Sequence, residues 1–124
     1  MEQRKILLIE DDDELRQLYK EIFIHNGFEV LEAADGDAGV NEALINKPDA
    51  IILDLMMPRQ GGLGALRVFR SNPESRNVPI FVMTALPDQK YRDMAQDKVQ
   101  GYFLKTEITP QQLVVKVKAV LDEK

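Results

Sequence analysis

Five short apolar runs divide the chain, and longer amphipathic stretches separate them. The first, third and fourth runs lack polar alternation, which is typical of parallel strands that helices cover on both faces. The second run alternates more, and this favours a strand at the edge of a sheet. The runs predict strands over residues 5–9, 28–33, 50–53, 79–83 and 102–104.

The hydrophobic period becomes helical after the first run. Gly27 then supplies a position that stops a helix. Because an acid directly before a helix is usually a cap or a partner of the helix dipole, we interpret Asp12 and Asp13 in that way. His25 is interpreted as a charge near the C-terminus of this helix. The apolar stripe of the predicted helix consists of Leu15, Leu18, Tyr19 and Ile22.

Later stretches predict four further helices. Residues 36–46 and 63–71 predict weaker helices, because each contains a glycine, and a proline follows each of them. The last helix has a fuller signal, since Thr109 is a capping residue, Pro110 takes the first helical position and Gln112 lies three residues after the cap. Its apolar face consists of Leu113, Val114, Val117, Val120 and Leu121. The fourth helix, in residues 88–98, has a thin apolar stripe of Tyr91, Met94 and Ala95.

Strand and helix alternate five times, which predicts an α/β fold with a doubly wound parallel sheet. Right-handed crossovers leave few topologies, and we expect a flavodoxin-like (βα)5 fold with a five-stranded parallel sheet in the order 2-1-3-4-5. The length suits a single domain over residues 1–124. In this strand order the ligand crevice lies beyond the carboxyl ends of strands one and three.

Composition and charge exclude several classes of function. No apolar run approaches the roughly 20 residues that span a bilayer, and we find no signal peptide, so no membrane association is expected. The formal charge of −5 argues against direct nucleic-acid binding by this domain. Cysteine is absent, which excludes disulfides and thiolate chemistry and is compatible with a reducing cytoplasm, where we expect the protein to reside.

Polar side chains follow four of the predicted strands. Four consecutive acids, residues 10–13, follow the first strand, Asp54 follows the third, Thr84 the fourth and Lys105 the fifth. Since the carboxyl ends of parallel strands meet at one edge of the sheet, we expect these groups to converge there.

Carboxylates gathered at one edge repel one another. Two charges about 5 Å apart cost about 3 kcal/mol at an effective dielectric constant near 20, which raises a carboxylate pKa by about 2 units unless a cation intervenes. The all-oxygen setting favours Mg²⁺ as that cation. Asp54 would then attack phosphorus as a nucleophile, while Lys105 neutralises the phosphoryl oxygens and Thr84 donates a hydrogen bond.

Four segments together resemble the receiver domain of two-component response regulators, and the resemblance spans the whole chain. The chain is similar to the single-domain type of receiver, of which chemotaxis regulators are examples. The segments are Ile6-Leu7-Leu8-Ile9-Glu10-Asp11-Asp12, Leu53-Asp54-Leu55-Met56-Met57-Pro58, Met83-Thr84-Ala85 and Gly101-Tyr102-Phe103-Leu104-Lys105.

The resemblance implies a role for each matching residue. Asp54 would be the phosphoacceptor, and Thr84 and Lys105 would bind the phosphoryl group. Tyr102 would be the switch aromatic that turns inward when the Thr84 hydroxyl moves. The implied Mg²⁺ ligands are Glu10, Asp11, Asp54 and the backbone carbonyl of Met56.

The implied partners are a sensor histidine kinase or a histidine phosphotransfer protein as phosphoryl donor, and a downstream protein or output domain. The thin stripe of the fourth helix suits a bistable element, so we expect the output face on helix four, strand five and helix five. By resemblance, the kinase would dock on the side of helix one.

One departure from the family pattern, and two positions that flank the family's site, carry expectations of their own. Thr106 stands where proline usually follows the lysine, so we expect a trans peptide bond between Lys105 and Thr106. The resemblance implies that Met56 and Leu86 flank the site; both are apolar here and cannot orient an attacking water, so we expect slow self-dephosphorylation. The protein would catalyse only its own phosphorylation and this slow reversal, and would not be an enzyme in the wider sense.

Three other functions can be compared with this interpretation of the sequence. A flavodoxin-type nucleotide binder is rejected, because four consecutive acids would repel a phosphate after the first strand. A dehalogenase-type phosphatase would need a second acid where Met56 stands. A phosphorylation-independent interaction module with a receiver fold stays open as the alternative. The sequence also leaves open whether the chain is a stand-alone regulator or part of a longer protein, and whether phosphorylation drives a homodimer.

Overall fold

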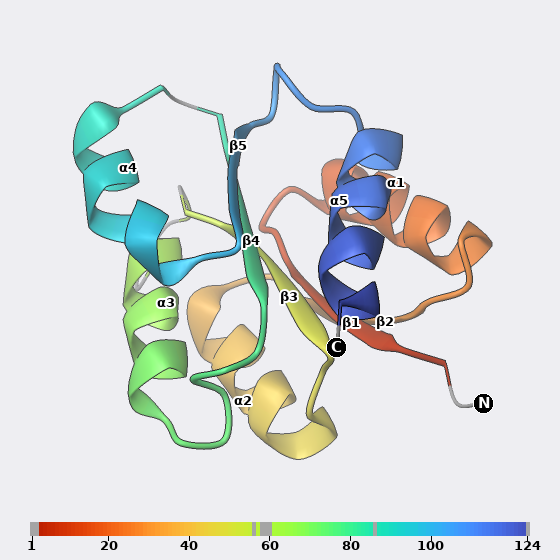
Figure 1. Ribbon diagram of the computed structural model, residues 1–124, viewed down its shortest axis with the longest axis horizontal. Coiled ribbons are helices and arrows are strands. Elements are labelled where there is room, and N and C mark those ends of the chain that lie inside the picture. The colour runs from red at the N-terminus through yellow and green to blue at the C-terminus, as the bar shows by residue number, and fades with distance from the viewer. Residues whose placement is uncertain (1–2, 56, 58–60, 86, 124) are drawn as a thin grey trace.

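A five-stranded parallel sheet forms the centre of the protein (Figure 1). The structure is a computed structural model, and it describes residues 3–55, 57, 61–85 and 87–123. The strands lie in the order β2-β1-β3-β4-β5, which confirms the predicted topology. Their bounds are Lys5–Ile9 for β1, Glu29–Ala33 for β2, Ala50–Asp54 for β3, Ile80–Thr84 for β4 and Gly101–Leu104 for β5.

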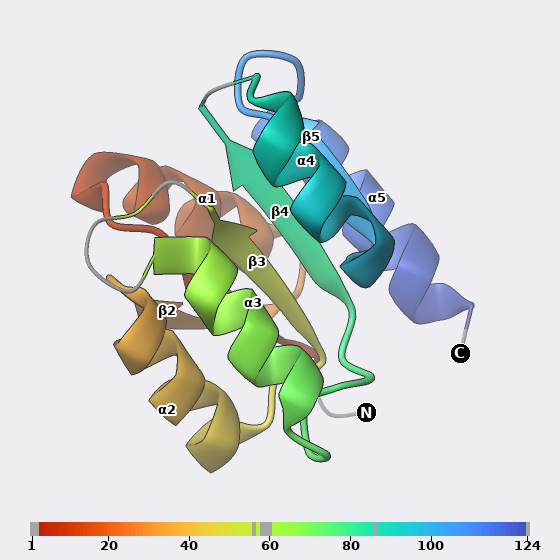
Figure 2. The same cartoon turned by 90° about the vertical axis from the view of Figure 1, so that its left-hand side faces the viewer.

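Helices cover both faces of the sheet (Figure 2). The apolar core on one face joins the sheet to α1 and α5, and the core on the other face joins it to α2, α3 and α4. The helices are α1 Asp13–His25, α2 Gly36–Asn46, α3 Gly61–Ser71, α4 Gln89–Ala95 and α5 Pro110–Asp122, and the 3-10 helix η1, Gln96–Lys98, follows α4. None of the helices in the described part of the chain has the length and apolarity needed to cross a membrane.

Side chains of the central strands explain why the sheet is buried on both faces. Every residue of β3 and β4 is buried, and so are four of the five residues of β1. Alternate residues of these strands enter the two cores, because successive side chains of a strand point to opposite faces. The runs without polar alternation therefore are the central strands, as predicted.

The strands run one residue further than predicted at two important positions. Asp54 is the last residue of β3 and pairs with Met83, and Thr84 is the last residue of β4 and pairs with Leu104. Both polar residues therefore belong to the strand ends rather than to the loops that follow. Their positions are fixed by the hydrogen-bonded ladder of the sheet.

The helices confirm most of the sequence prediction. Asp12 caps α1 by accepting hydrogen bonds from the backbone N–H groups of residues 14 and 15, and Asp13 lies in the first turn. Thr109 and Gln112 form a capping box at α5. The peptide bond between Lys105 and Thr106 is trans, as expected.

Two helix details differ from the prediction. Leu18 belongs to the predicted apolar stripe of α1, but 45% of it is exposed, whereas Tyr19 and Phe23 are buried. Leu15, Tyr19, Ile22 and Phe23 pack into the core that α1 shares with the sheet and α5, and Leu18 is not part of that core. The predicted fourth helix is divided, since α4 ends at Ala95 and η1 continues to Lys98.

Candidate functional site

The carboxyl ends of four strands bring the predicted polar residues to one edge of the sheet. Glu10 directly follows β1, Asp54 ends β3, Thr84 ends β4 and Lys105 directly follows β5. The pairing of neighbouring strands sets these ends at the same level. The convergence expected from the topology is therefore present in the fold.

Three carboxylates form a cluster at this edge. Glu10, Asp11 and Asp54 each place a carboxylate oxygen within 4.8 Å of the other two. Glu10 and Asp54 are buried, with exposed fractions of 3% and 4%, whereas Asp11 is open to solvent. Desolvation raises the pKa of Asp11, and the hydrogen bond and charge of Glu10 raise it further. The carboxylates of the cluster thus repel one another, and solvent reaches the cluster on the side of Asp11.

The ammonium group of Lys105 contacts two of these acids. Its Nζ lies 2.6 Å from Oε1 of Glu10 and 3.1 Å from Oδ2 of Asp54. Burial alone would lower the pKa of Lys105, but the hydrogen bond to Glu10 and the charges of Asp54 and Glu10 raise it above its ordinary value. The backbone N–H of Lys105 also donates to the Thr84 carbonyl over 2.8 Å. Lys105 is therefore charged and held in place by both main chain and side chain.

The donor set fits a hard divalent cation. Three carboxylates face one ammonium group, so negative charge stays in excess. All the cluster's ligand atoms are oxygens, which Mg²⁺ prefers, and the exposed side at Asp11 leaves room for the waters that Mg²⁺ retains. The predicted backbone ligand at Met56 lies outside the residues that the structure describes.

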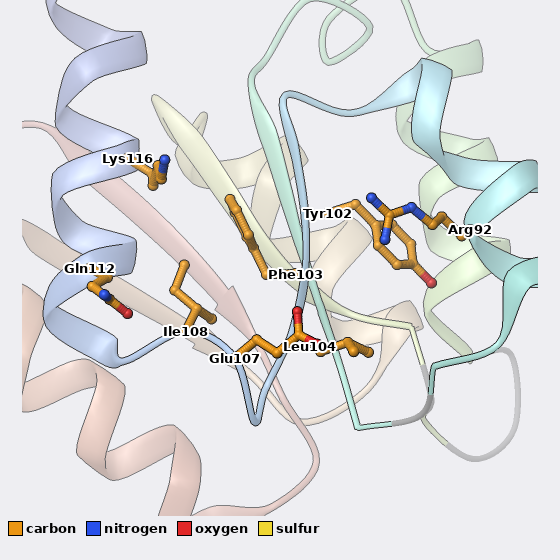
Figure 3. A pocket seen from close by; sticks show the side chains of 8 residues that line it. All are labelled: Arg92, Tyr102, Phe103, Leu104, Glu107, Ile108, Gln112 and Lys116. Atoms are coloured by element: carbon orange, nitrogen blue, oxygen red, sulfur yellow. The ribbon is translucent and has the colours of Figure 1, made fainter.

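Thr84 lies at the same edge of the sheet as the acid cluster, whereas Tyr102 lies further from that edge on β5. Thr84 is 1% exposed at the end of β4. Tyr102 pairs with Val82 further back along the sheet, and the guanidinium carbon of Arg92 lies 5.5 Å from the centre of its ring (Figure 3). The Tyr102 hydroxyl is buried and has no hydrogen-bond partner among the described residues, and burial raises its pKa.

A pocket of about 290 Å³ opens beside Tyr102, between α4, β5 and α5 (Figure 3). It lies on the face where the sequence places the output surface. Its lining residues are Arg92, Tyr102, Phe103, Leu104, Glu107, Ile108, Gln112 and Lys116.

Sequence reasoning assigned no role to two residues that shape this site. Gly62 donates its backbone N–H to the Leu55 carbonyl over 3.2 Å, so the first turn of α3 lies directly against the chain that follows Asp54. Arg16 donates to the Glu10 carbonyl over 2.7 Å. Two small residues at 61–62 are a weak sequence signal for a close approach, and no sequence signal identifies Arg16.

The fold and the site together define the class of this protein. It is a doubly wound α/β domain with an acidic cluster at the carboxyl edge of its sheet. Residues 6–118 match the family model described as Response regulator receiver domain, and the chain belongs to this family. It is a receiver domain of the two-component phosphorelay type, and receiver domains are signalling proteins. The family and the fold class predicted from the sequence are thereby confirmed.

Curated relatives include longer regulators. The chain is 30% identical to the phosphate regulon transcriptional regulatory protein PhoB of Klebsiella pneumoniae, over 95% of this chain and 52% of the relative. It is 31% identical to the transcriptional regulatory protein CpxR of Escherichia coli K12, over 94% of this chain and 49% of the relative. The chain thus spans about half the length of these relatives.

Solved structures of similar length share the fold. A putative response regulator from Chloroflexus aurantiacus J-10-fl is 28% identical and superposes with a TM-score of 0.88. The match covers 98% of this chain and 99% of that one.

Proposed function

We propose that this receiver domain accepts a phosphoryl group on Asp54 in a Mg²⁺-dependent reaction. The donor is a sensor histidine kinase or a histidine phosphotransfer protein. The observation that carries the proposal is the pair of contacts from Lys105 to Glu10 and to the buried carboxylate of Asp54. A buried carboxylate that shares one cation with a second acid is placed for chemistry rather than for stability alone.

Each side chain has one task in the proposed transfer. An oxygen of Asp54 forms a bond to phosphorus, the bond from phosphorus to the donor's histidine nitrogen breaks, and its electron pair stays on that nitrogen. The product is an aspartyl phosphate. Lys105 pairs with the phosphoryl oxygens, and the Thr84 hydroxyl donates a hydrogen bond to one of them. Mg²⁺ held by Glu10, Asp11, Asp54 and the Met56 carbonyl would neutralise charge on the phosphoryl group.

Hydrolysis of the aspartyl phosphate is slow in this proposal. Met56 lies two residues beyond Asp54 and Leu86 two residues beyond Thr84; both side chains are apolar, and both residues lie outside the described part of the chain. An apolar side chain cannot orient an attacking water as a general base does. A phosphoryl half-life of seconds would contradict this part of the proposal.

The switch to a downstream protein or output domain uses Thr84 and Tyr102. A difference in burial between two helices supports α4 as the element that moves. Ala95 is the buried residue of α4, whereas α5 buries four residues. A weakly anchored helix shifts at low cost when a neighbouring loop moves. The output face therefore consists of α4, β5 and α5, which surround the pocket beside Tyr102. The donor docks on the side of α1.

The proposal is tested by intact mass after incubation with acetyl phosphate, with and without Mg²⁺. We expect a Mg²⁺-dependent gain of about 80 Da in the wild type and none in Asp54→Asn. Asp49→Asn is the matched control, because it makes the same change at the exposed residue just before the opposite end of β3 and should keep the gain. If the folded wild type gains no mass, the alternative function, a phosphorylation-independent interaction module, takes its place.

A further inference from the structure

Arg16 on α1 contacts the main chain of the acid cluster rather than its carboxylates. Its Nη1 donates to the carbonyl oxygen of Glu10 over 2.7 Å. Its Nη2 lies 2.7 Å from Oδ1 of Asp13, and its Nε lies 3.3 Å from Oε1 of Glu32. All three guanidinium nitrogens thus have partners, and only 17% of the side chain is exposed. A planar group with three partners holds its position more firmly than a flexible one.

The bond to the Glu10 carbonyl orients the peptide that joins Glu10 to Asp11. On the other side of the same residue, the Glu10 N–H donates to the Ala33 carbonyl over 3.1 Å. The main chain of Glu10 is therefore held by β2 through its N–H and by α1 through its carbonyl. Since the two acids are neighbours in the chain, this peptide sets how their carboxylates face each other.

Glu32 on the edge strand β2 holds Arg16 in turn. It also accepts a hydrogen bond from Lys20 over 2.8 Å, and this bond, more than the contact with Arg16, lowers the pKa of Glu32. Two cations, Arg16 and Lys20, thereby face two acids, Asp13 and Glu32. Because these charges balance, the network acts on the acid cluster chiefly through position rather than through its field.

We propose that Arg16 is a positioning residue that sets the divalent-cation affinity of the Glu10, Asp11 and Asp54 cluster, and that Glu32 keeps Arg16 in place. This inference rests on the proposed function, because it assumes that the cluster binds Mg²⁺. Residues that orient metal ligands typically change metal affinity 10- to 100-fold when they are replaced.

Charge and position predict opposite results for Arg16→Gln. Loss of a positive charge near the acids would by itself strengthen the binding of a cation. Loss of the bond to the Glu10 carbonyl frees the peptide before Asp11, so the site must be ordered when the metal binds, and binding weakens. The sign of the change therefore separates the two effects.

The test is isothermal titration of the unphosphorylated full chain with Mg²⁺ at constant ionic strength. We expect Arg16→Gln to raise the dissociation constant about tenfold, and Arg16→Lys, which keeps the charge and one donor group, to raise it less. Arg4→Gln is the matched control. Arg4 lies just before β1, at the end of that strand opposite the acid cluster, and forms a 2.7 Å ion pair with Asp122. Its dissociation constant should stay within about twofold of wild type. Binding by Arg16→Gln that equals or exceeds wild type would overturn the inference.

A second pair of variants makes the test independent of the folding of Arg16→Gln. Glu32→Gln removes the residue that holds Arg16, and Glu29→Gln makes the same change on the same strand further from the cluster. We expect Glu32→Gln to weaken Mg²⁺ binding about threefold more than Glu29→Gln does. Equal affinities of these two variants would also overturn the inference.

Failure of the proposed function gives a different result. Wild-type protein that binds no Mg²⁺, or binds it as well after Asp11→Asn, overturns the metal site and this inference with it. Wild-type binding that depends on Asp11 but is unchanged in Arg16→Gln and Glu32→Gln overturns this inference alone.

Discussion

At the scale of single residues, the positive charge of Lys105 offsets part of the negative charge of the acid cluster. Its ammonium group reaches Glu10 and Asp54 from the end of β5, and its backbone is tied to the end of β4. The same charge that stabilises two buried carboxylates would compete with a metal ion for them. In the proposed reaction, Lys105 would therefore have opposite effects on cation binding and on phosphoryl transfer.

Lys105→Met is predicted to separate these two effects. Without the ammonium group the acid cluster gains net negative charge, so Mg²⁺ should bind on the order of tenfold more tightly. Phosphorylation by acetyl phosphate should nevertheless slow by on the order of 100-fold, because a cation that faces the phosphoryl oxygens is lost. Titration calorimetry and the time course of intact mass measure the two quantities. Weaker Mg²⁺ binding, or transfer at the wild-type rate, would contradict the assignment of Lys105.

Residue positions were predictable where the sheet itself fixes them. Glu10, Asp54 and Lys105 meet because they end or follow parallel strands, and the strands could be recognised from their apolar runs. Arg16 could not be found in this way, because its partner Glu32 lies on a different element and both residues look like ordinary surface charges in the sequence. The roles of Thr84 and Tyr102 as switch residues stay predictions.

At the scale of elements, α3 is placed by a contact that only glycine allows. A Cβ atom at Gly62 would overlap the Asp54 carbonyl oxygen and the Leu55 Cα atom, and both of these are main-chain atoms that cannot turn aside. The first turn of α3 thus lies against the end of the strand that carries Asp54, the proposed acceptor. The sequence predicted this helix from residue 63, and the structure begins it at Gly61.

Gly62→Ala is predicted to lower the free energy of unfolding by about 2 kcal/mol, because the added methyl group must push α3 away from β3. Urea unfolding followed by circular dichroism measures this change. Gly64→Ala in the same helix is the control, since Gly64 is only partly buried and alanine favours a helix by up to about 1 kcal/mol. A Gly62→Ala variant as stable as Gly64→Ala would show that the close approach is unimportant.

The two helices of the proposed output face differ in how firmly they are held. α5 buries Leu113, Val114, Val117 and Leu121 and begins with a capping box, whereas Ala95 is the buried residue of α4.

Native-state hydrogen exchange is therefore predicted to be faster in α4 than in α5. Amides of residues 91–95 should exchange through local opening, and amides of residues 114–121 should exchange only near the free energy of global unfolding. Equal protection of the two helices would remove the physical basis for α4 as the moving element of the switch.

At the scale of the whole molecule, repulsion within the acid cluster should cost stability that the proposed bound cation would restore. Two of its three carboxylates are buried beside each other, and the chain as a whole carries a formal charge of −5. A cation that binds the folded state but not the unfolded state raises the free energy of unfolding, by about 2.7 kcal/mol at a concentration 100 times its dissociation constant.

Mg²⁺ is thus predicted to raise the thermal unfolding midpoint of the wild-type protein, compared with NaCl at equal ionic strength. Asp11→Asn should lose most of this increase, because Asp11 is the exposed acid of the cluster and its replacement leaves the core unchanged. Differential scanning calorimetry measures the midpoints. An equal rise in wild type and Asp11→Asn would place the effect of Mg²⁺ elsewhere on the surface.

The topology was the feature that sequence determined most completely. Unbroken apolar runs identify central strands, alternating residues identify an edge strand, and handedness leaves few ways to connect them. The ends of the helices were less predictable, because the division between α4 and η1 and the exposure of Leu18 depend on packing between elements. Periodicity in one helix contains no information about its neighbours.

The ion pair between Arg4 and Asp122 joins the segment before β1 to the last turn of α5, so the two ends of the described chain lie together. A short peptide linker could therefore connect Gln3 to Glu123, and new termini could be opened in the turn that follows α3, before β4 begins. In such a circular permutant the strands would be synthesised in a different order, yet β1, β3 and β5 would still end at the same edge. Comparison of the permutant with the original chain would show whether the convergence of Glu10, Asp54 and Lys105 depends on the order in which the strands are synthesised or only on the completed sheet.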